Sequence, residues 1–183
     1  VAIGAPALAA LNPQFLFASS GASNDALLAL ITTSVLYVCL WVSAGHDRPY
    51  ASPLVLGLLV GLAGLTKLSG LAVGLVVIAA YLLRWDRRRP WWPTVVRPLL
   101  IVLGVACVVC GWWYVRNGRD YGDPFGMRSY HGIFGVYPQP LGFAQTTVFL
   151  FESLLSYWGV FGWMNVLADE FFYTLVRLFS ILA

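Results

Sequence analysis

Four long runs without a charged side chain constrain this sequence more than any other feature. They contain twenty, eighteen, sixteen and eighteen residues, at 26–45, 49–66, 68–83 and 98–115. A helix needs about 20 consecutive apolar residues to cross the hydrocarbon core of a bilayer. We therefore expect an integral membrane protein.

The composition agrees with this expectation and excludes several other classes of protein. Of the 183 residues, 60% are hydrophobic and 10% are charged, whereas soluble domains have about 45–50% and 25%. A disordered chain, a disulfide-stapled secreted module and a typical cytosolic enzyme are thereby excluded. The basic residues are too few and too local for a nucleic-acid partner. Cys107 and Cys110 lie in an apolar run, where we expect them to be packing residues.

The apolar runs predict an all-α fold, a polytopic transmembrane bundle that forms one multi-pass domain over 1–183. Asn12-Pro13 predicts a bend before the second span. Because the chain opens on Val1 without a signal peptide and ends shortly after Arg177, we expect a fragment of a longer protein. The expected spans are at about 1–18, 26–45, 53–66, 68–84, 98–115 and 171–183.

Charge asymmetry orients these spans. The segment 84–97 carries five arginines against one aspartate, which indicates a cytoplasmic loop. The segment 116–170 carries three arginines against five acids and is rich in glycine, proline and aromatic residues. We expect it to be a long extracytoplasmic loop, with an interfacial helix near 149–166.

Tracing the spans back from the arginine-rich loop places the HDRP turn at 46–49 inside. Asp25, Lys67 and the long loop then converge on the outer face. This topology needs a helical hairpin that breaks at Lys67. In the alternative, a single tilted helix over 53–83 would leave Lys67 in the middle of the bilayer.

Asp25 and Lys67 are the two charges in this apolar region that most need explanation. Asp25 opens an apolar helix, where it is either a cap suited to the helix dipole or a catalytic or metal-binding carboxylate. A lysine inside a membrane segment costs roughly 2.5–3.5 kcal/mol, so it normally has a partner or faces water. Lys67 therefore either snorkels from a turn or holds a phosphate.

Three further residues are weaker candidates. Arg116 stands where a span is expected to end, where it either anchors to lipid head groups or binds a phosphodiester through two hydrogen bonds. His131 and Glu152 are possible ligands or proton carriers, although single residues of this kind are usually structural. No dinucleotide, phosphate-loop, zinc-protease or serine-hydrolase motif is present.

Four segments carry a resemblance to a known family. The sequences ALNPQFLFASSGASNDALLALITTSVLY, GLLVGLAGLTKLSGLAVGL, WWYVRNGRDYGDPFG and SYWGVFGWMNV resemble, in the same order, the lipid-carrier-dependent glycosyltransferases of the GT-C membrane fold. This group includes dolichyl-phosphate-mannose–protein mannosyltransferases and bacterial aminoarabinose transferases. The likeness is greatest to less characterised bacterial relatives.

The resemblance implies a multi-pass enzyme of the bacterial plasma membrane that transfers a sugar from a polyprenyl-phosphate carrier to an extracytoplasmic acceptor. It implies a catalytic role for Asp25, and it implies that Lys67, Arg116 and Asn117 bind the carrier phosphate or substrate. His131, in the same outer segment, is a further candidate for substrate binding. The implied partners are the lipid-linked donor and membrane lipids, while the acceptor, the sugar and a divalent metal stay open. The family's principal acidic pair lies upstream of Val1, so this chain alone is expected to be inactive.

Two other functions are compatible with the sequence. In a transporter or flippase, Asp25 and Lys67 would line a translocation path, although such proteins usually place ionisable residues near the middle of the membrane. In a non-enzymatic subunit of cell-envelope polysaccharide assembly, the aromatic loop would bind a partner. An intact acidic pair upstream would favour the enzyme over both alternatives.

Overall fold

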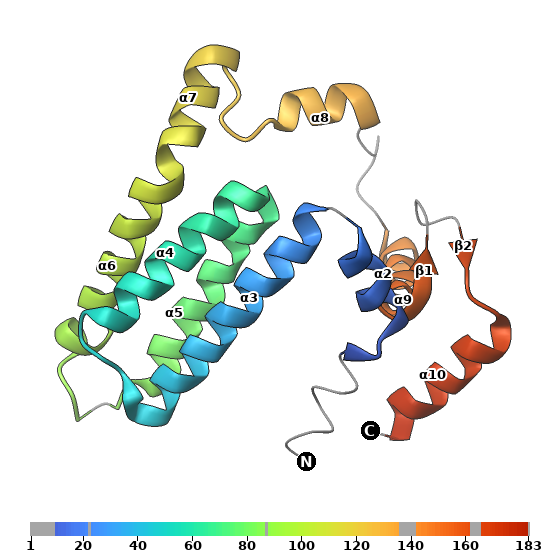
Figure 1. Ribbon diagram of the computed structural model, residues 1–183, viewed down its shortest axis with the longest axis horizontal. Coiled ribbons are helices and arrows are strands. Elements are labelled where there is room, and N and C mark those ends of the chain that lie inside the picture. Colours follow the sequence, from blue (N-terminus) through green and yellow to red (C-terminus); the bar gives the residue numbers. More distant parts are fainter. Residues whose placement is uncertain (1–9, 22, 87, 136–141, 162–165, 183) are drawn as a thin grey trace. The chain divides into compact units, whose positions relative to one another are not determined.

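The computed structural model describes residues 10–21, 23–86, 88–135, 142–161 and 166–182 (Figure 1). The described chain is mostly helical, in agreement with the expected class. It divides into two compact units. One is Asn24–Gly135, and the other combines Val1–Ser23 with Val136–Ala183.

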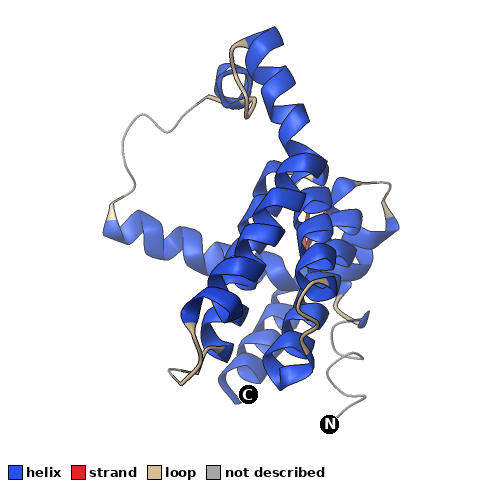
Figure 2. Cartoon of the chain, turned by 90° about the vertical axis from the view of Figure 1, so that its left-hand side faces the viewer, coloured by secondary structure: helices blue, strands red, loops and turns tan. Residues whose placement is uncertain are grey.

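The unit Asn24–Gly135 is a bundle of antiparallel helices (Figures 1 and 2). A π-helical turn extends α3 (Asn24–Trp41) to His46. Two further π-helical turns lead into and out of α6 (Arg97–Ala106), so that Trp92–Tyr121 is one continuous helix. A short 3-10 turn, Leu68–Ala72, precedes α5. The helices are α3 (Asn24–Trp41), α4 (Ala51–Thr66), α5 (Val73–Arg84), α6 (Arg97–Ala106), α7 (Trp112–Tyr121) and α8 (Met127–Phe134).

The apolar stretch over 53–83 is a hairpin in the structure and not a single helix. Helix α4 ends at Thr66, and Lys67 adopts an extended conformation with φ −158° and ψ 142°. The chain then returns so closely that a Cβ on Gly70 would lie 2.3 Å from the carbonyl oxygen of Ala63. Only glycine fits this approach, so the sharp reversal depends on Gly70.

Helix α4 lies between α3 and α6 and packs against both (Figure 1). Close contact with α6 requires glycine, because a Cβ on Gly57 would lie 2.7 Å from Val105 Cβ, and one on Gly61 would lie 2.6 Å from Val109 Cβ. Small residues at helix interfaces allow such backbone approach. The buried core that results consists of Val35, Cys39, Val42, Leu56, Val60, Val77, Ala80, Tyr81, Val95, Val102 and Ala106.

Much of the described part of the segment 116–170, which the sequence predicts as an outer loop, is helical. Helix α7 continues past Val115 to Tyr121 and ends at Gly122, whose φ of 64° is left-handed. Arg116 and Asp120 stand one turn apart and form an ion pair of 3.2 Å that supports this extension. From Arg116 onward the helix carries polar side chains, but the helix itself continues to Tyr121.

The second unit contains α2 (Pro13–Ser20), α9 (Phe143–Gly159), the strands β1 (Val160–Phe161) and β2 (Val166–Leu167), and α10 (Glu170–Leu182). The strands pair antiparallel, so the fold is not purely α-helical as expected. The interfacial helix expected near 149–166 instead starts and ends seven or so residues earlier, as α9. Residues 1–9 of the first expected span, and 136–141 and 162–165 of the expected loop, lie outside the described residues.

Side chains of α2 hold the second unit together locally. Asn12 caps α2 by accepting the N–H of Phe15 at 3.0 Å, and its amide donates to the carbonyl of Tyr157 at 3.2 Å. Gln14 accepts the N–H of Val160 at 2.9 Å. Asn12 and Gln14 thus bind backbone groups at the end of α9 and at the start of β1.

Within the described residues, two helices are long and apolar enough to cross a membrane: Asn24–His46 and Trp92–Tyr121. Two further apolar helices, Ala51–Thr66 and Leu68–Arg84, are shorter. Large apolar side chains face outward along this unit, among them Leu40, Leu83 and Val108 at 71–84% exposure. A continuous exposed apolar surface of this kind favours contact with lipid over contact with water.

Candidate functional site

Asp25 and Lys67 form an ion pair at one end of the helical bundle. The ammonium Nζ of Lys67 lies 2.6 Å from Oδ1 of Asp25, although the two residues are 42 positions apart. Asp25 belongs to the first turn of α3, and Lys67 follows the last residue of α4. The amide of Asn24 also donates to the carbonyl of Thr66 at 3.4 Å. The structure thus brings together the two charges that the sequence singles out.

The pair is open to its surroundings, with side-chain exposures of 44% for Lys67 and 55% for Asp25. Exposed pairs contribute only about 0–1 kcal/mol to stability, so the fold does not depend strongly on this one. The carboxylate lies at the positive end of the α3 dipole. A ligand phosphate can therefore compete for the ammonium at small cost to the fold.

Arg116 and Asn117 line a hollow of about 330 Å³ at the α7–α8 junction. The guanidinium of Arg116 lies 5.3 Å from the ring centre of Trp113 and contacts Asp120. The hollow is polar on one side and aromatic on the other. Its lining residues are Trp113, Arg116, Asn117, Tyr121, Asp123, Gly126 and Ser129.

Asp123 also lines this hollow, although it is not among the candidate residues that the sequence indicates. The side chain is buried, and its Oδ2 accepts the N–H of Arg128 at 2.7 Å at the start of α8. Burial alone would raise the pKa of the Asp123 carboxyl, but backbone N–H donors led by those of Arg128 and Met127 outweigh it and lower the pKa below its ordinary value. The signal in the sequence was the YGDP turn, where aspartate often accepts such bonds.

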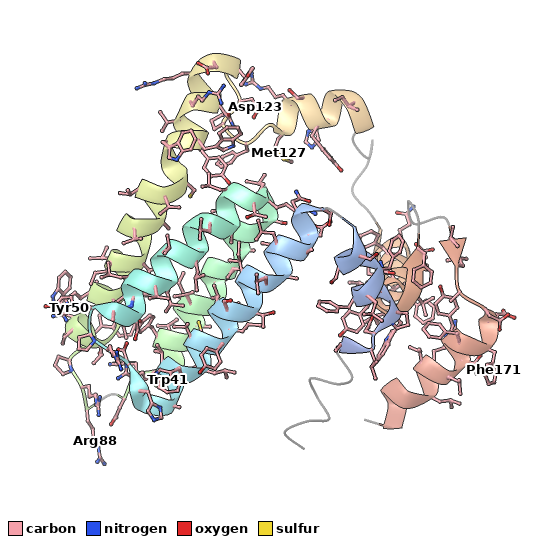
Figure 3. All side chains as sticks on the ribbon, viewed as in Figure 1. Trp41, Tyr50, Arg88, Asp123, Met127 and Phe171 are labelled. Carbon is pink, nitrogen blue, oxygen red and sulfur yellow. The ribbon has the colours of Figure 1, made fainter. Side chains whose placement is uncertain are left out.

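A hydrogen bond from α7 ties the hollow to the end of α4. The hydroxyl of Tyr114 donates to the carbonyl of Gly64 at 2.6 Å, three residues before Lys67. Figure 3 shows Asp123 and Met127 at this end of the unit, while Trp41, Tyr50 and Arg88 lie at the other. The ion pair and the hollow therefore share one end of the bundle, although no hydrogen bond or ion pair between described residues joins them directly.

The other candidate residues stand apart from this end site. His131 is exposed on α8, and within the described chain no hydrogen bond or ion pair links it to Asp25, Lys67, Arg116 or Asn117. Glu152 belongs to the second unit, on α9, where it lines a separate hollow of about 620 Å³. Among the residues that the structure describes, no group of three His, Cys, Asp or Glu side chains could hold a metal ion.

An apolar groove of about 610 Å³ runs between α5 and the helix Trp92–Tyr121. At one end it is lined by Leu82 and Trp91, and at the other by Leu71 and Cys110. The second end adjoins the candidate site, because a Cβ on Gly64 would lie 3.4 Å from Cys110 Sγ. The groove is wide enough and apolar enough for a hydrocarbon chain.

Comparison with protein families, with curated proteins and with solved structures finds no match to this chain.

Proposed function

We propose that this chain forms part of a multi-pass membrane glycosyltransferase of the bacterial plasma membrane, which transfers a sugar from a polyprenyl-phosphate carrier to an acceptor on the extracytoplasmic face. The observation that carries the proposal is the Asp25–Lys67 ion pair at one end of the apolar helices α3 and α4. The family resemblance of the segments around these residues supports it.

The transfer requires two kinds of group at one place. In the reaction the acceptor oxygen bonds to the anomeric carbon, the bond from that carbon to the phosphate oxygen breaks, and the acceptor proton passes to a base. A carboxylate such as Asp25 supplies a proton acceptor, and cations such as Lys67 and Arg116 stabilise the departing phosphate. Asn117 provides an amide donor within the hollow that Arg116 lines.

The apolar groove supports a lipid-linked donor. A polyprenyl chain needs a path along the bilayer that ends beside the reacting phosphate. The groove between α5 and Trp92–Tyr121 ends at Leu71 and Cys110, next to the end of α4 that leads to Lys67. A soluble nucleotide-sugar donor would have no use for such a groove.

Transfer assays on the complete gene product test this proposal. We expect Asp25→Asn and Lys67→Ala to lower the incorporation of labelled sugar from a polyprenyl-phosphate donor into membrane vesicles by about 10²–10⁴-fold. Asp86→Asn changes an exposed charge at the opposite end of the bundle and should leave transfer within about twofold of wild type. Immunoblots of the membrane fraction control for folding. Unchanged transfer in both site variants would overturn the enzymatic role.

A further inference from the structure

The end of the bundle opposite Asp25 and Lys67 carries a surplus of exposed positive charge. Of its acids, Asp47 is neutralised by an ion pair with Arg84, and Asp86 accepts the backbone N–H of Arg88 at 3.0 Å. Three arginines of this end are exposed and form no ion pair with any described residue: Arg48, Arg88 and Arg89. Their charge is available to a ligand.

Arg48 lines a small hollow of about 260 Å³ together with Tyr37, Val38 and Trp41. Tyr37 and Trp41 stand one turn apart on α3, with ring centres 6.3 Å apart and exposures of 65% and 47%. The hollow therefore has an aliphatic and aromatic wall beside a cation. Aromatic side chains of this kind favour the head-group level of a bilayer.

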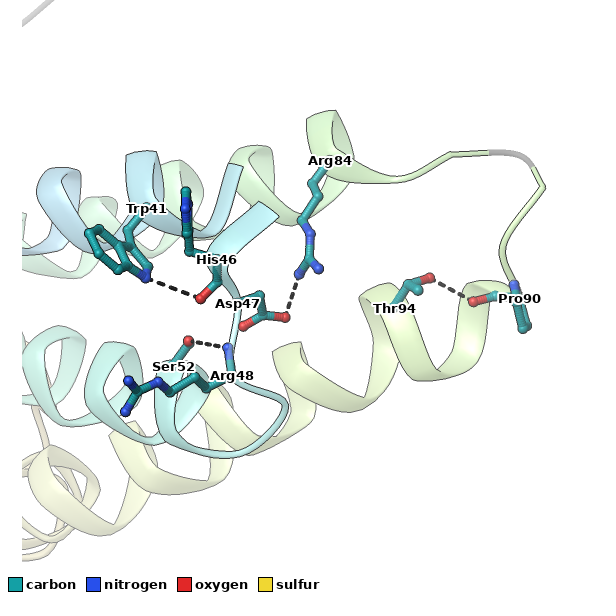
Figure 4. A network of polar contacts seen from close by, with 8 residues as sticks. All are labelled: Trp41, His46, Asp47, Arg48, Ser52, Arg84, Pro90 and Thr94. Carbon is teal, nitrogen blue, oxygen red and sulfur yellow. Dashed lines mark hydrogen bonds and ion pairs between the residues drawn. The ribbon is translucent and has the colours of Figure 1, made fainter. Parts of the chain in front are cut away.

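Local hydrogen bonds fix the chain around this hollow (Figure 4). The indole Nε1 of Trp41 donates to the carbonyl of His46 at 3.1 Å, and the backbone N–H of Arg48 donates to Ser52 Oγ at 2.9 Å. Gly45, with a φ of +90°, allows the chain to reverse between them. The backbone that carries Arg48 is thus held in place, while its guanidinium stays unpaired among the described residues.

We propose that this end of the bundle binds an anionic phospholipid of the bilayer, with Arg48 on the lipid phosphate and the glycerol and upper acyl chain against Tyr37 and Trp41. A guanidinium binds phosphate oxygens through two parallel hydrogen bonds. Arg88 and Arg89 add to the attraction for the anionic head group. The rings of Tyr37 and Trp41 favour a lipid over free phosphate, because free phosphate has no apolar part to contact them and would be held by charge alone.

The inference rests on the membrane placement of α3 but not on sugar transfer, and a lipid titration tests it. The purified chain in detergent is titrated with palmitoyl-oleoyl phosphatidylglycerol and with the phosphatidylcholine of the same acyl chains, and bound lipid is counted by native mass spectrometry. We expect phosphatidylglycerol to bind at least about tenfold more tightly. Arg48→Gln should weaken its binding about fivefold, the effect of one arginine near an anionic surface.

Matched controls make the result specific. Arg119→Gln removes an exposed arginine from the other end of the bundle and should leave lipid binding unchanged. Tyr37→Ala should weaken the binding of phosphatidylglycerol without changing the circular dichroism spectrum. Equal affinity for the two lipids, or an equal loss in Arg48→Gln and Arg119→Gln, would overturn the inference. So would displacement of the lipid by glycerol phosphate at equal concentration, which would indicate a free-phosphate site.

One further measurement separates this inference from the proposed function. The chain is mixed with vesicles of each lipid and sedimented. Retention in both kinds of vesicle with no preference between them contradicts the lipid site alone. Failure to associate with either kind contradicts the membrane placement, and with it both proposals.

Discussion

At the scale of single residues, glycines in similarly apolar helices have different roles in this bundle. Gly57 lies where a Cβ would come within 2.8 Å of the carbonyl oxygen of Val102, whereas a Cβ on Gly104 would meet nothing within 4 Å. Both lie inside apolar helices. Hydropathy cannot separate them, because it does not show which face of a helix meets a neighbour.

We expect Gly57→Ala to destabilise the bundle by about 1–3 kcal/mol, since the added methyl group forces α4 and α6 apart. Gly104→Ala should be neutral or stabilising by up to about 1 kcal/mol, because alanine favours the helix. Thermal unfolding of both variants in the same detergent measures the difference. Equal midpoints for the two would contradict the close packing of α4 against α6.

Sequence reasoning located Asp25 and Lys67 well, because a charge in an apolar run has few structural explanations. It did not find Asp123. An aspartate in a polar, glycine-rich segment looks like an ordinary turn residue, and its burial and backbone hydrogen bonds arise only when α8 folds back over it. The folded conformation of the segment 123–129 carries this information, and its composition does not.

At the scale of elements, the apolar helices were predictable and the polar ones were not. The break at Lys67 and the extent of α3 follow from hydrophobic length. The composition of the last turns of α7 and of α8, with glycine and charged residues, predicts a loop. In the structure, the Arg116–Asp120 ion pair stabilises the end of α7, and the hydrogen bond from the N–H of Arg128 to Asp123 stabilises the start of α8. These polar contacts offset the low helix propensity of the segment.

The start of α8 should depend on the ionised carboxylate of Asp123. Its pKa is lowered in the folded chain, so its stabilising contribution is present above about pH 4 and is lost as the pH falls toward the lowered value. We expect Asp123→Ala to reduce hydrogen-exchange protection of the Met127 and Arg128 amides at pH 6. Wild type should keep this protection at pH 6 and lose it as the pH falls through the lowered pKa of Asp123.

Asp120→Asn is the matched control for this experiment, because Asp120 is exposed and pairs only with the Arg116 side chain among the described residues. Its substitution should leave the two amides protected at pH 6. If Asp123→Ala left protection unchanged, the hydrogen bonds to Asp123 would not be what orders the start of α8.

At the scale of the whole Asn24–Gly135 unit, the two ends of the bundle differ in chemistry. One end has an ion pair and a polar hollow beside α7 and α8, and the other has unpaired arginines among tryptophans (Figure 3). The rule that short cytoplasmic loops are rich in Arg and Lys orients such a bundle. If the unit spans a membrane, we therefore expect the arginine end to be cytoplasmic.

Cysteine labelling in intact cells tests this orientation. In a background where exposed Cys107 is replaced by serine, we expect a membrane-impermeant maleimide to label Asp120→Cys from outside. Arg88→Cys should react only after permeabilisation, because it lies at the arginine end. Labelling of Arg88→Cys in intact cells would reverse the topology and remove the candidate site from the extracytoplasmic face.

The close fit of α4 against α6 has a consequence for how the protein is made. Val102 leaves the ribosome about 45 residues after Gly57, which at roughly 5–20 residues per second takes about 2–9 s. During that interval the glycine face of α4 has no helix to cover it, and in a bilayer lipid must fill the space. If this unit is inserted into a bilayer, we therefore expect α6 to displace lipid from α4 seconds after α4 itself has been inserted.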